Sequence, residues 1–484
     1  MSGSPTVTGH VVVIGAGVSG LAAAHRLLGR GARVTVLEAS DRVGGKLLPG
    51  EIAGVRVDLG AESMLARRPE AVALAREVGL ADRLQPPATA TASIWTRDAL
   101  RPMPKGHVMG VPGTAAALSG VLSDEGLARI ERDADLPRTE VGDDVAVGEY
   151  VAARLGREVV DRLVEPLLGG VYAGDAYRIS MRSAVPQLFQ AARTHASLTE
   201  AVRDIQAKAE AGRQTGPVFM GIEGGVGQLP LAVAESVRAR GGEILTGTPV
   251  TDLRREAGAG WRVVAGDRVL HADAVVVAVP APAAARLLDA ESPEAAAELR
   301  TVEYASMALV TLAYRRADTD LPEGSGFLVP PVDGRTIKAS TFASRKWGWI
   351  ADEDPDVVVL RTSVGRYGET EILGREDAEL VDVSRHDLRA ATGLDAQPLE
   401  TRVVRWTDGL PQYPVGHHAR VARIREHVAK LPGLAVCGAQ YDGVGIPACI
   451  ASAYAAVDQL GGDLSGVEEL TANPVQSLHG GSGE

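Results

Sequence analysis

An apolar run that ends in closely spaced glycines is the feature that most restricts the fold of this chain. Residues 11–20 read VVVIGAGVSG, and the helix-like segment LAAAHRLL follows directly. A buried strand that passes through a tight glycine turn into a helix begins a doubly wound parallel sheet. The free N–H groups and the dipole of such a helix bind phosphate. The stretch therefore predicts an α/β fold with a site for the pyrophosphate of a dinucleotide.

Each glycine of this turn has its own steric role. Gly15 allows the tight turn, Gly17 lets the backbone approach a pyrophosphate, and Gly20 lets the helix pack closely on the strand. A second strand, expected at 33–37, ends in Glu38, close to the spacing from which an acid binds a ribose hydroxyl. The residues expected at this end of the cofactor are Gly15, Ala16, Gly17, Val18, Ser19, Gly20, Glu38 and Ala39.

A second glycine pair distinguishes between dinucleotides. Residues 38–46 read EASDRVGGK. A nicotinamide-binding domain has no need of this pair. An FAD-binding chain passes the pyrophosphate a second time, where a cation adds positive charge and glycines keep side chains out of the path. The pattern resembles the FAD-dependent amine oxidase and desaturase superfamily. We therefore expect FAD, in contact with Arg42, Gly44, Gly45 and Lys46, although a solvated surface charge is the alternative for Arg42.

Later parts of the chain supply the rest of a discontinuous flavin domain. Residues 221–250 read as a glycine turn, a helix and a short strand, and 273–280 read as another buried strand. Val250 stands where related proteins lay a backbone amide against adenine. Residues 434–460 read as a strand, a glycine loop and a helix that begins near Pro447. The positive end of that helix would stabilise negative charge on a reduced flavin.

The remaining segments divide between helices and a mixed sheet. Residues 111–215 carry apolar residues three and four positions apart, and 306–315 and 356–364 are strand-like. We expect an α/β protein: a discontinuous Rossmann-like FAD-binding domain with a mixed α+β substrate domain and a helical insertion. The expected segments are 1–88, 216–290 and 416–465 for the FAD-binding domain, 89–110 and 291–415 for the substrate domain, 111–215 for the helical insertion and 466–484 for a flexible tail.

Charge and composition exclude several classes of partner. The formal net charge of -12 argues against nucleic acid, which requires a basic face. No Cys/His cluster has metal spacing, and Cys437 and Cys449 are expected to be buried free thiols in a reducing cytoplasm. The longest apolar run, about 274–285, is too short to cross a bilayer. We expect a cytoplasmic protein with no transmembrane segment, and peripheral membrane contact is the alternative.

Four further segments resemble the bacterial porphyrinogen oxidases, the family of protoporphyrinogen and coproporphyrinogen III oxidases. They are LGREVVDRLVEPLLGGVYAGDAYRISMRS (155–183), DLGAESM (58–64), WTDGLPQYPVGH (406–417) and GVGIP (443–447). The YAGD and PQYPVGH segments are more specific than the glycine motif, which amine oxidases and phytoene desaturases share. The resemblance extends from about residue 10 to 462. Ala448 departs from it, because an Asp commonly follows GVGIP, so no polar role is expected at this position.

The resemblance implies a flavoenzyme of haem biosynthesis. Such proteins bind FAD non-covalently and remove six electrons from a porphyrinogen, with dioxygen as acceptor and hydrogen peroxide as product. The flavin carries the chemistry, so no catalytic side chain is required. Transient contact with a neighbouring enzyme of haem synthesis is compatible with this activity. The resemblance places these further residues at the cofactor: Gly60, Ala61, Glu62, Ser63, Trp406, Gly438, Val444, Gly445 and Ile446.

The flavin motifs do not choose the substrate within the family. We expect coproporphyrinogen III, oxidised to coproporphyrin III, since the chain shows no membrane anchor and this substrate is the more water-soluble. The segments also look most like the soluble enzymes of Gram-positive bacteria. Protoporphyrinogen IX is the alternative substrate. Another amine oxidase or desaturase-type flavoenzyme, or a non-catalytic FAD-binding protein, is less favoured.

The propionate groups of a porphyrinogen favour arginine, which binds carboxylates bidentately. Arg67 and Arg68 follow the DLGAES segment and are the substrate-binding candidates, with solvated surface arginines as the alternative. Weaker candidates are Arg97, Arg101 and Lys105. The histidines that could act as a base are His195, His417 and His418, although a structural or surface role fits each of them better.

Overall fold

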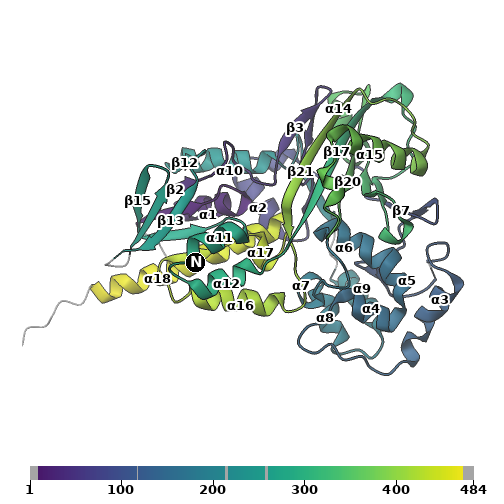
Figure 1. Ribbon diagram of the computed structural model, residues 1–484, viewed down its shortest axis with the longest axis horizontal. Coiled ribbons are helices and arrows are strands. Elements are labelled where there is room, and N and C mark those ends of the chain that lie inside the picture. Colours follow the sequence, from purple (N-terminus) through teal and green to yellow (C-terminus); the bar gives the residue numbers. More distant parts are fainter. Residues whose placement is uncertain (1–8, 117, 213–215, 257–259, 472–484) are drawn as a thin grey trace, which may run out of the picture.

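Three lobes are arranged around the centre of the molecule (Figure 1). The structure is a computed structural model that describes residues 9–116, 118–212, 216–256 and 260–471. We call the lobes the Rossmann lobe, built on a parallel sheet, the sheet lobe, built on a mixed sheet, and the helical lobe, which contains α3 to α9. This arrangement confirms the predicted α/β fold class.

The Rossmann lobe is built on a five-stranded parallel sheet from distant parts of the chain. In spatial order its strands are β12 (Glu243–Leu245), β2 (Arg33–Leu37), β1 (His10–Ile14), β16 (Ala274–Val277) and β22 (Leu434–Val436). Every neighbouring pair is parallel. Short runs of Val, Ile and Leu form these strands because both faces of the sheet are covered.

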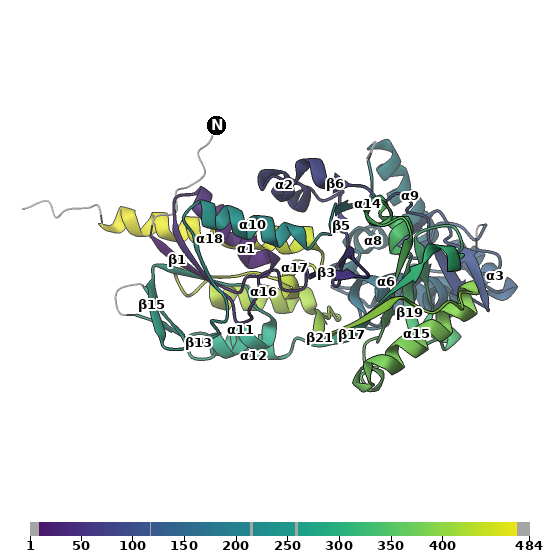
Figure 2. The ribbon, with the colours of Figure 1, turned by 90° about the horizontal axis from the view of Figure 1, so that it is seen from above.

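Alternate side chains of β1 enter two separate cores. Val11 and Val13 pack with α1 (Val18–Gly29), α10 (Gln228–Ala239) and α18 (Ile446–Thr471), which run side by side (Figure 2). Val12 and Ile14 enter the opposite core. That core also contains residues of β13 (Val250–Arg255), β14 (Trp261–Ala265), β15 (Arg268–Ala272), α11 (Ala281–Leu288), α12 (Pro293–Arg300) and α16 (His417–Val428).

The sheet lobe contains a seven-stranded mixed sheet. In spatial order its strands are β21 (Glu400–Pro411), β17 (Tyr304–Arg315), β20 (Val357–Val364), β19 (Ile337–Thr341), β18 (Gly326–Leu328), β7 (Ser93–Thr96) and β8 (Ala99–Pro102). Helix α15 (Asp377–Thr392) covers one face, where Leu380 and Leu388 pack against Val310 and Leu360. Met307 and Leu309 of β17 instead line a cavity, which places that cavity on the sheet lobe's inner side.

The helical lobe lies below the sheet lobe in Figure 1. Its helices are α3 (Asp124–Glu131), α4 (Val147–Leu155), α5 (Arg157–Val159), α6 (Glu165–Tyr172), α7 (Met181–Ala184), α8 (Pro186–Ala192) and α9 (Leu198–Ala211), with a π-helical turn at Val160–Val164. A fully buried ion pair joins Arg154 to Asp133 at 2.7 Å. Asp133 also accepts hydrogen bonds from Ser197 and Thr199, so the buried carboxylate is fully satisfied.

Short elements connect the lobes. They are β3 (Pro49–Ile52), β4 (Val55–Asp58), β5 (Met64–Leu65), α2 (Pro69–Glu77), β6 (Leu84–Gln85), β9 (His107–Val108), β10 (Val111–Pro112), β11 (Phe219–Ile222), α13 (Ala343–Lys346), α14 (Gly348–Glu353) and α17 (Ala439–Asp442). Within the described ranges, no helix is both long and apolar enough to cross a membrane.

Some boundaries differ from those expected from the sequence. Helix α1 begins at Val18 rather than Leu21, because extended Gly17 caps it and the end of the glycine motif is already helical. Helix α17 interrupts the loop after Gly438, where no helix was expected. Helix α18 continues to Thr471, past residue 466, at which a flexible tail was expected to start; residues 472–484 lie outside the described part of the chain.

Candidate active site

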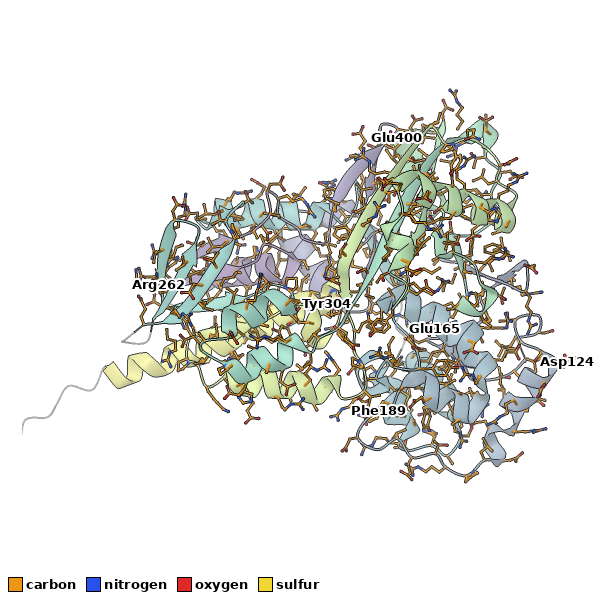
Figure 3. The ribbon with its side chains drawn as sticks, in the orientation of Figure 1. Asp124, Glu165, Phe189, Arg262, Tyr304 and Glu400 are labelled. Carbon is orange, nitrogen blue, oxygen red and sulfur yellow. The ribbon has the colours of Figure 1, made fainter. Side chains whose placement is uncertain are left out.

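A cavity of about 980 Å³ lies between the Rossmann lobe and the inner side of the sheet lobe. Tyr304, labelled in Figure 3, lines it at the junction between these lobes. The cavity brings together most of the residues that the sequence assigned to the cofactor. Those that line it are Gly15, Gly17, Val18, Ser19, Glu38, Ala39, Gly44, Gly45, Lys46, Gly60, Ala61, Glu62, Val250, Trp406, Gly438, Val444 and Ile446. Ala16, Gly20, Arg42, Ser63 and Gly445 are not among the lining residues.

The glycines of the phosphate turn have the steric roles expected from the sequence. Gly15 has a φ of +104°, and a Cβ there would come within 2.6 Å of the Ala278 carbonyl oxygen. A Cβ on Gly20 would come within 1.9 Å of the Gly15 carbonyl oxygen, so Gly20 permits helix α1 to pack on β1. A Cβ on Gly17 would meet no atom within 4 Å, because Gly17 faces the cavity. The N-terminus of α1 is therefore open to a phosphate group.

Glu38 is held in a fixed orientation at one end of the cavity. Its carboxylate accepts hydrogen bonds from the backbone N–H of Ala16 at 2.8 Å and of Ser40 at 2.9 Å. Val250 and Arg286 line the cavity with it, and the α11 side chain of Arg286 is exposed. A ribose and an adenine fit this end, where an acid meets hydroxyls. Arg286 has no motif around it, so no pattern in the sequence marks it as a cofactor residue.

The second glycine pair crosses directly over the phosphate turn. Gly44 and Gly45 have φ values of +102° and +56°, and Gly44 N–H donates to the Ala16 carbonyl at 2.8 Å. Arg42 does not line the cavity, because its guanidinium donates to the Gly45 carbonyl at 2.7 Å. The side chain of Arg42 therefore fixes the shape of this loop.

Residues 59–62 form a wall of the cavity that the sheet lobe holds in place. Trp406 donates its indole N–H to the Leu59 carbonyl at 3.2 Å, and Arg361 donates to the Gly60 carbonyl at 2.7 Å. Glu62 pairs with Lys346 at 2.5 Å and with Arg361 at 3.0 Å. Burial alone would raise the pKa of Glu62, but these two cations hold it below its usual value.

The C-terminal loop brings the N-terminus of α18 to the cavity. Ile446, at the start of this helix, and Cys449 line the cavity. Cys437 and Cys449 are both buried and free, as expected from the sequence. Burial raises the pKa of the Cys449 thiol to about 11, so this thiol is protonated and unreactive near neutral pH. Ala448 is buried, in keeping with the expected loss of a polar role there.

Lys338 is a buried cation on the sheet-lobe side of the cavity, at a position that no sequence motif marks. It lies on β19, is 7% exposed, and its ammonium group is 3.8 Å from the sulfur of Met307. Burial, with a smaller contribution from the nearby Arg366, lowers the pKa of Lys338 to about 7. Burial also lowers the pKa of Lys46 on the cofactor side. The sequence signal for Lys338 is weak, since it is a single lysine in a short strand-like segment, 337–341.

The structure places the proposed substrate arginines outside the cavity lining. Arg67 is exposed, and Arg68 pairs with Glu70 at 2.8 Å. None of the weaker candidates, Arg97, Arg101 and Lys105, lines the cavity either. Binding of a substrate carboxylate by Arg67 or Arg68 therefore stays a prediction, at a position beside the cavity.

The three histidines considered as bases also lie away from the cavity lining. His417 is buried against the ring of Tyr413 at 4.1 Å between centroids, and burial lowers its pKa to about 4. His195 contacts the Ala191 carbonyl at 3.0 Å, and His418 is exposed. These positions agree with the structural or surface roles that the sequence favoured.

The residues at the cavity fit FAD. The open N-terminus of α1 suits the pyrophosphate, Glu38 suits the ribose, and the wall at 59–62 with the N-terminus of α18 suits the flavin ring. The described residues contain no group of three or more His, Cys, Asp or Glu side chains that could hold a metal ion.

Comparison with known proteins agrees with this geometry. The flavin containing amine oxidoreductase family matches residues 18–461. A coproporphyrinogen III oxidase of Mycobacterium tuberculosis is 40% identical over 455 residues, covering 92% of this chain and 96% of that protein. The coproporphyrinogen III oxidase of Bacillus subtilis is 33% identical, with 93% and 97% covered, and the protoporphyrinogen oxidase of Bos taurus is 31% identical, with 91% and 96% covered.

Solved structures give the same assignment of the fold. A crystal structure from Exiguobacterium sp. 255-15 matches with a TM-score of 0.83 and 32% identity, covering 94% of this chain and 99% of that one. Cyclohexylamine oxidase from Brevibacterium oxydans matches with a TM-score of 0.68 and 18% identity, covering 95% and 99%, which shows a shared fold alone. The chain belongs to the flavin-containing amine oxidoreductase family and is an FAD-dependent oxidoreductase.

Proposed function

We propose that this protein oxidises coproporphyrinogen III to coproporphyrin III, with dioxygen as the electron acceptor and hydrogen peroxide as the product. The observation that carries the proposal is the extension of the cavity past the cofactor residues. It continues between the inner side of the sheet lobe and α6, where Met307, Leu309 and Leu328 supply an apolar surface and Lys338 supplies a buried amine. A porphyrinogen would complement this lining, because it has a broad apolar face and carboxylate groups that an amine can bind.

The reaction removes six hydrogens as three pairs, each pair a hydride and a proton, and reduces three dioxygen molecules to three hydrogen peroxide molecules. FAD, when bound, accepts the hydrides. The chain supplies position and electrostatics. Its apolar lining excludes water, and Lys338, with a pKa of about 7, either pairs with a propionate or accepts a proton.

The choice of coproporphyrinogen III rests on the relatives. The bacterial proteins that match this chain over more than nine-tenths of both lengths are named for that substrate. The bovine protein, named for protoporphyrinogen, is the basis for protoporphyrinogen IX as the alternative. This activity implies a role in haem synthesis in the cytoplasm. It also implies transient contact with the enzyme that uses the porphyrin product.

The proposal is tested by oxidation of both porphyrinogens in air at matched concentrations, followed by product fluorescence. Heat-treated protein gives the correction for spontaneous oxidation. We expect a higher kcat/KM for coproporphyrinogen III and formation of hydrogen peroxide. A higher kcat/KM for protoporphyrinogen IX would reassign the substrate. Failure of both porphyrinogens to bleach the bound flavin without oxygen would reject a porphyrinogen oxidase altogether.

A further inference from the structure

Glu62 pairs with two cations at the wall of the cavity. It follows β4, a connecting strand that packs against the sheet lobe, whereas Lys346 ends α13 and Arg361 lies on β20. The side chains of Glu62, Lys346 and Arg361 are 14%, 18% and 10% exposed, so water screens this cluster weakly. Glu62 and Arg361 both line the cavity.

The same cluster holds the backbone of the wall. Arg361 uses one guanidinium nitrogen for Glu62 and another for the Gly60 carbonyl. The backbone at Gly60 packs closely on the phosphate side, because a Cβ there would come within 2.1 Å of the Lys46 carbonyl oxygen. The hydrogen bonds of Arg361 therefore hold both the wall and the carboxylate on it.

Charge compensation distinguishes Glu62 from its acidic neighbour. Asp58 accepts backbone N–H bonds from Val226 at 2.8 Å and Gly227 at 2.9 Å, just before α10. Burial outweighs these bonds and raises the pKa of Asp58 to about 7, so Asp58 carries less negative charge than Glu62 near neutral pH. The partners of Glu62 are instead two side-chain cations. Lys346 can be neutralised by substitution without removing a hydrogen bond to backbone, whereas Arg361 also holds the Gly60 carbonyl.

We propose that Glu62 is a positioning residue that sets the midpoint potential of the bound flavin by offsetting the charges of Lys346 and Arg361. Reduction adds negative charge to the flavin, so a carboxylate in the wall opposes reduction and a cation favours it. The proposal rests on the FAD dependence of the chain and does not require a porphyrinogen substrate.

The test is a redox titration of the purified FAD-bound protein with a chemical reductant and an indicator dye, followed by flavin absorbance. Glu62→Gln removes the carboxylate charge and keeps the side chain's shape; the potential should become more positive. Lys346→Met removes one cation, and the potential should become more negative. We expect about a tenfold change in the reduction equilibrium in each case, which is about 30 mV for a two-electron couple.

Glu353→Gln is the matched control, because Glu353 pairs with Arg56 at 2.6 Å on the partly exposed side of the same junction. It should leave the potential unchanged. If the substitutions only loosened the site, the midpoint potentials of both test variants would shift in the same direction, toward that of free FAD. Shifts of opposite sign therefore support the proposal. Shifts of the same sign, no shift, or loss of FAD from both variants would overturn it. The titration involves no porphyrinogen, so its failure would leave the proposed substrate unaffected.

Discussion

At the scale of the single residue, Lys338 shows how burial changes what a charged side chain can do. Arg68 is partly exposed beside Glu70, and its charge is already paired. Lys338 is buried against Met307 with a pKa lowered to about 7, so small changes in its surroundings alter its charge near neutral pH. A buried amine that faces the cavity is therefore the better candidate for an electrostatic contact with substrate.

The first prediction concerns the pH dependence of substrate binding. Below about pH 7 the amine of Lys338 is protonated and can pair with a carboxylate, and above this pH the pairing is lost. We expect KM to rise as pH increases through about 7. Lys338→Met should raise KM at low pH by about tenfold, the value of a charged hydrogen bond of about 1.5 kcal/mol, and remove the pH dependence. Steady-state kinetics from pH 6 to 9 measure both effects.

Arg67→Ala and Arg68→Ala belong in the same series. The carboxylate site would be reassigned to the position beside the cavity if KM rose in either variant with flavin content intact, while KM of Lys338→Met stayed the same as in the unaltered protein. An identical KM–pH curve for Lys338→Met and the unaltered protein would contradict the role given to Lys338.

At the scale of the element, helix ends and the loops before them determine the shape of the site. Helix α18 begins at Ile446 on the cavity, directly after the loop that contains Gly443 and Gly445. Helix α16 begins at His417, whose ring Nε2–H donates to the Tyr441 carbonyl at 3.0 Å. This hydrogen bond joins the start of α16 to α17 in the C-terminal loop.

The second prediction separates cofactor crowding from protein crowding in that loop. A Cβ on Gly445 would meet only the Pro447 ring, at 3.9 Å, so the protein itself has room for a side chain. Gly445→Val should lower FAD content or turnover far more than the melting temperature of the FAD-free protein. Gly443 is the contrasting control: its φ is +151° and a Cβ would come within 2.7 Å of Ala448, so Gly443→Val should destabilise the fold directly. Normal FAD content and normal rate in Gly445→Val would refute close approach of this loop to the flavin.

The third prediction concerns acid stability at the start of α16. Burial lowers the pKa of His417 from about 6.5 to about 4. Between these values the unfolded chain binds a proton that the folded chain does not, so the free energy of unfolding falls as the pH falls from about 6.5 to about 4. The slope contributed by this group approaches about 1.4 kcal/mol per pH unit. Urea unfolding of His417→Gln across this range should show a shallower dependence; an unchanged slope would mean that His417 is not the group responsible.

At the scale of the whole molecule, the cavity exists only where distant segments meet. The parallel sheet itself combines residues 10–14, 33–37, 243–245, 274–277 and 434–436. The lining then adds residues from β17 and β19 in the sheet lobe and Gly170 from α6 in the helical lobe. A ligand that fills this cavity contacts all three lobes, so its binding and the stability of the fold are coupled.

The fourth prediction follows from this coupling. The purified protein should be yellow, and acid precipitation should release one FAD per chain, because both cysteines are buried and free. Removal of FAD should lower the melting temperature, and added FAD should restore it; at about 100 times Kd the stabilisation is about 2.7 kcal/mol. NAD serves as the control ligand. Flavin that stays on the precipitated chain, or a melting temperature that responds to NAD and not to FAD, would contradict the cofactor assignment.

Local residue patterns were enough to predict the phosphate turn, the second glycine pair, the acid at the end of β2 and the family. These features depend on backbone sterics within a few tens of residues: Gly15 needs a positive φ, Gly20 needs contact with β1, and Gly44 needs to pass Ala16. Such requirements produce a characteristic spacing of glycines that is recognisable in the sequence alone.

The partners and the burial of the charged groups depend on contacts between distant segments of the folded chain. Glu62 pairs with Lys346 and Arg361, which lie almost 300 positions away, and Arg42 binds its own loop. Lys338 becomes a cavity residue only because β19 joins a sheet with strands from both sides of it in the chain. A side chain's charge, pKa and contacts depend on desolvation and on long-range neighbours, and no local spacing in the sequence encodes either of them.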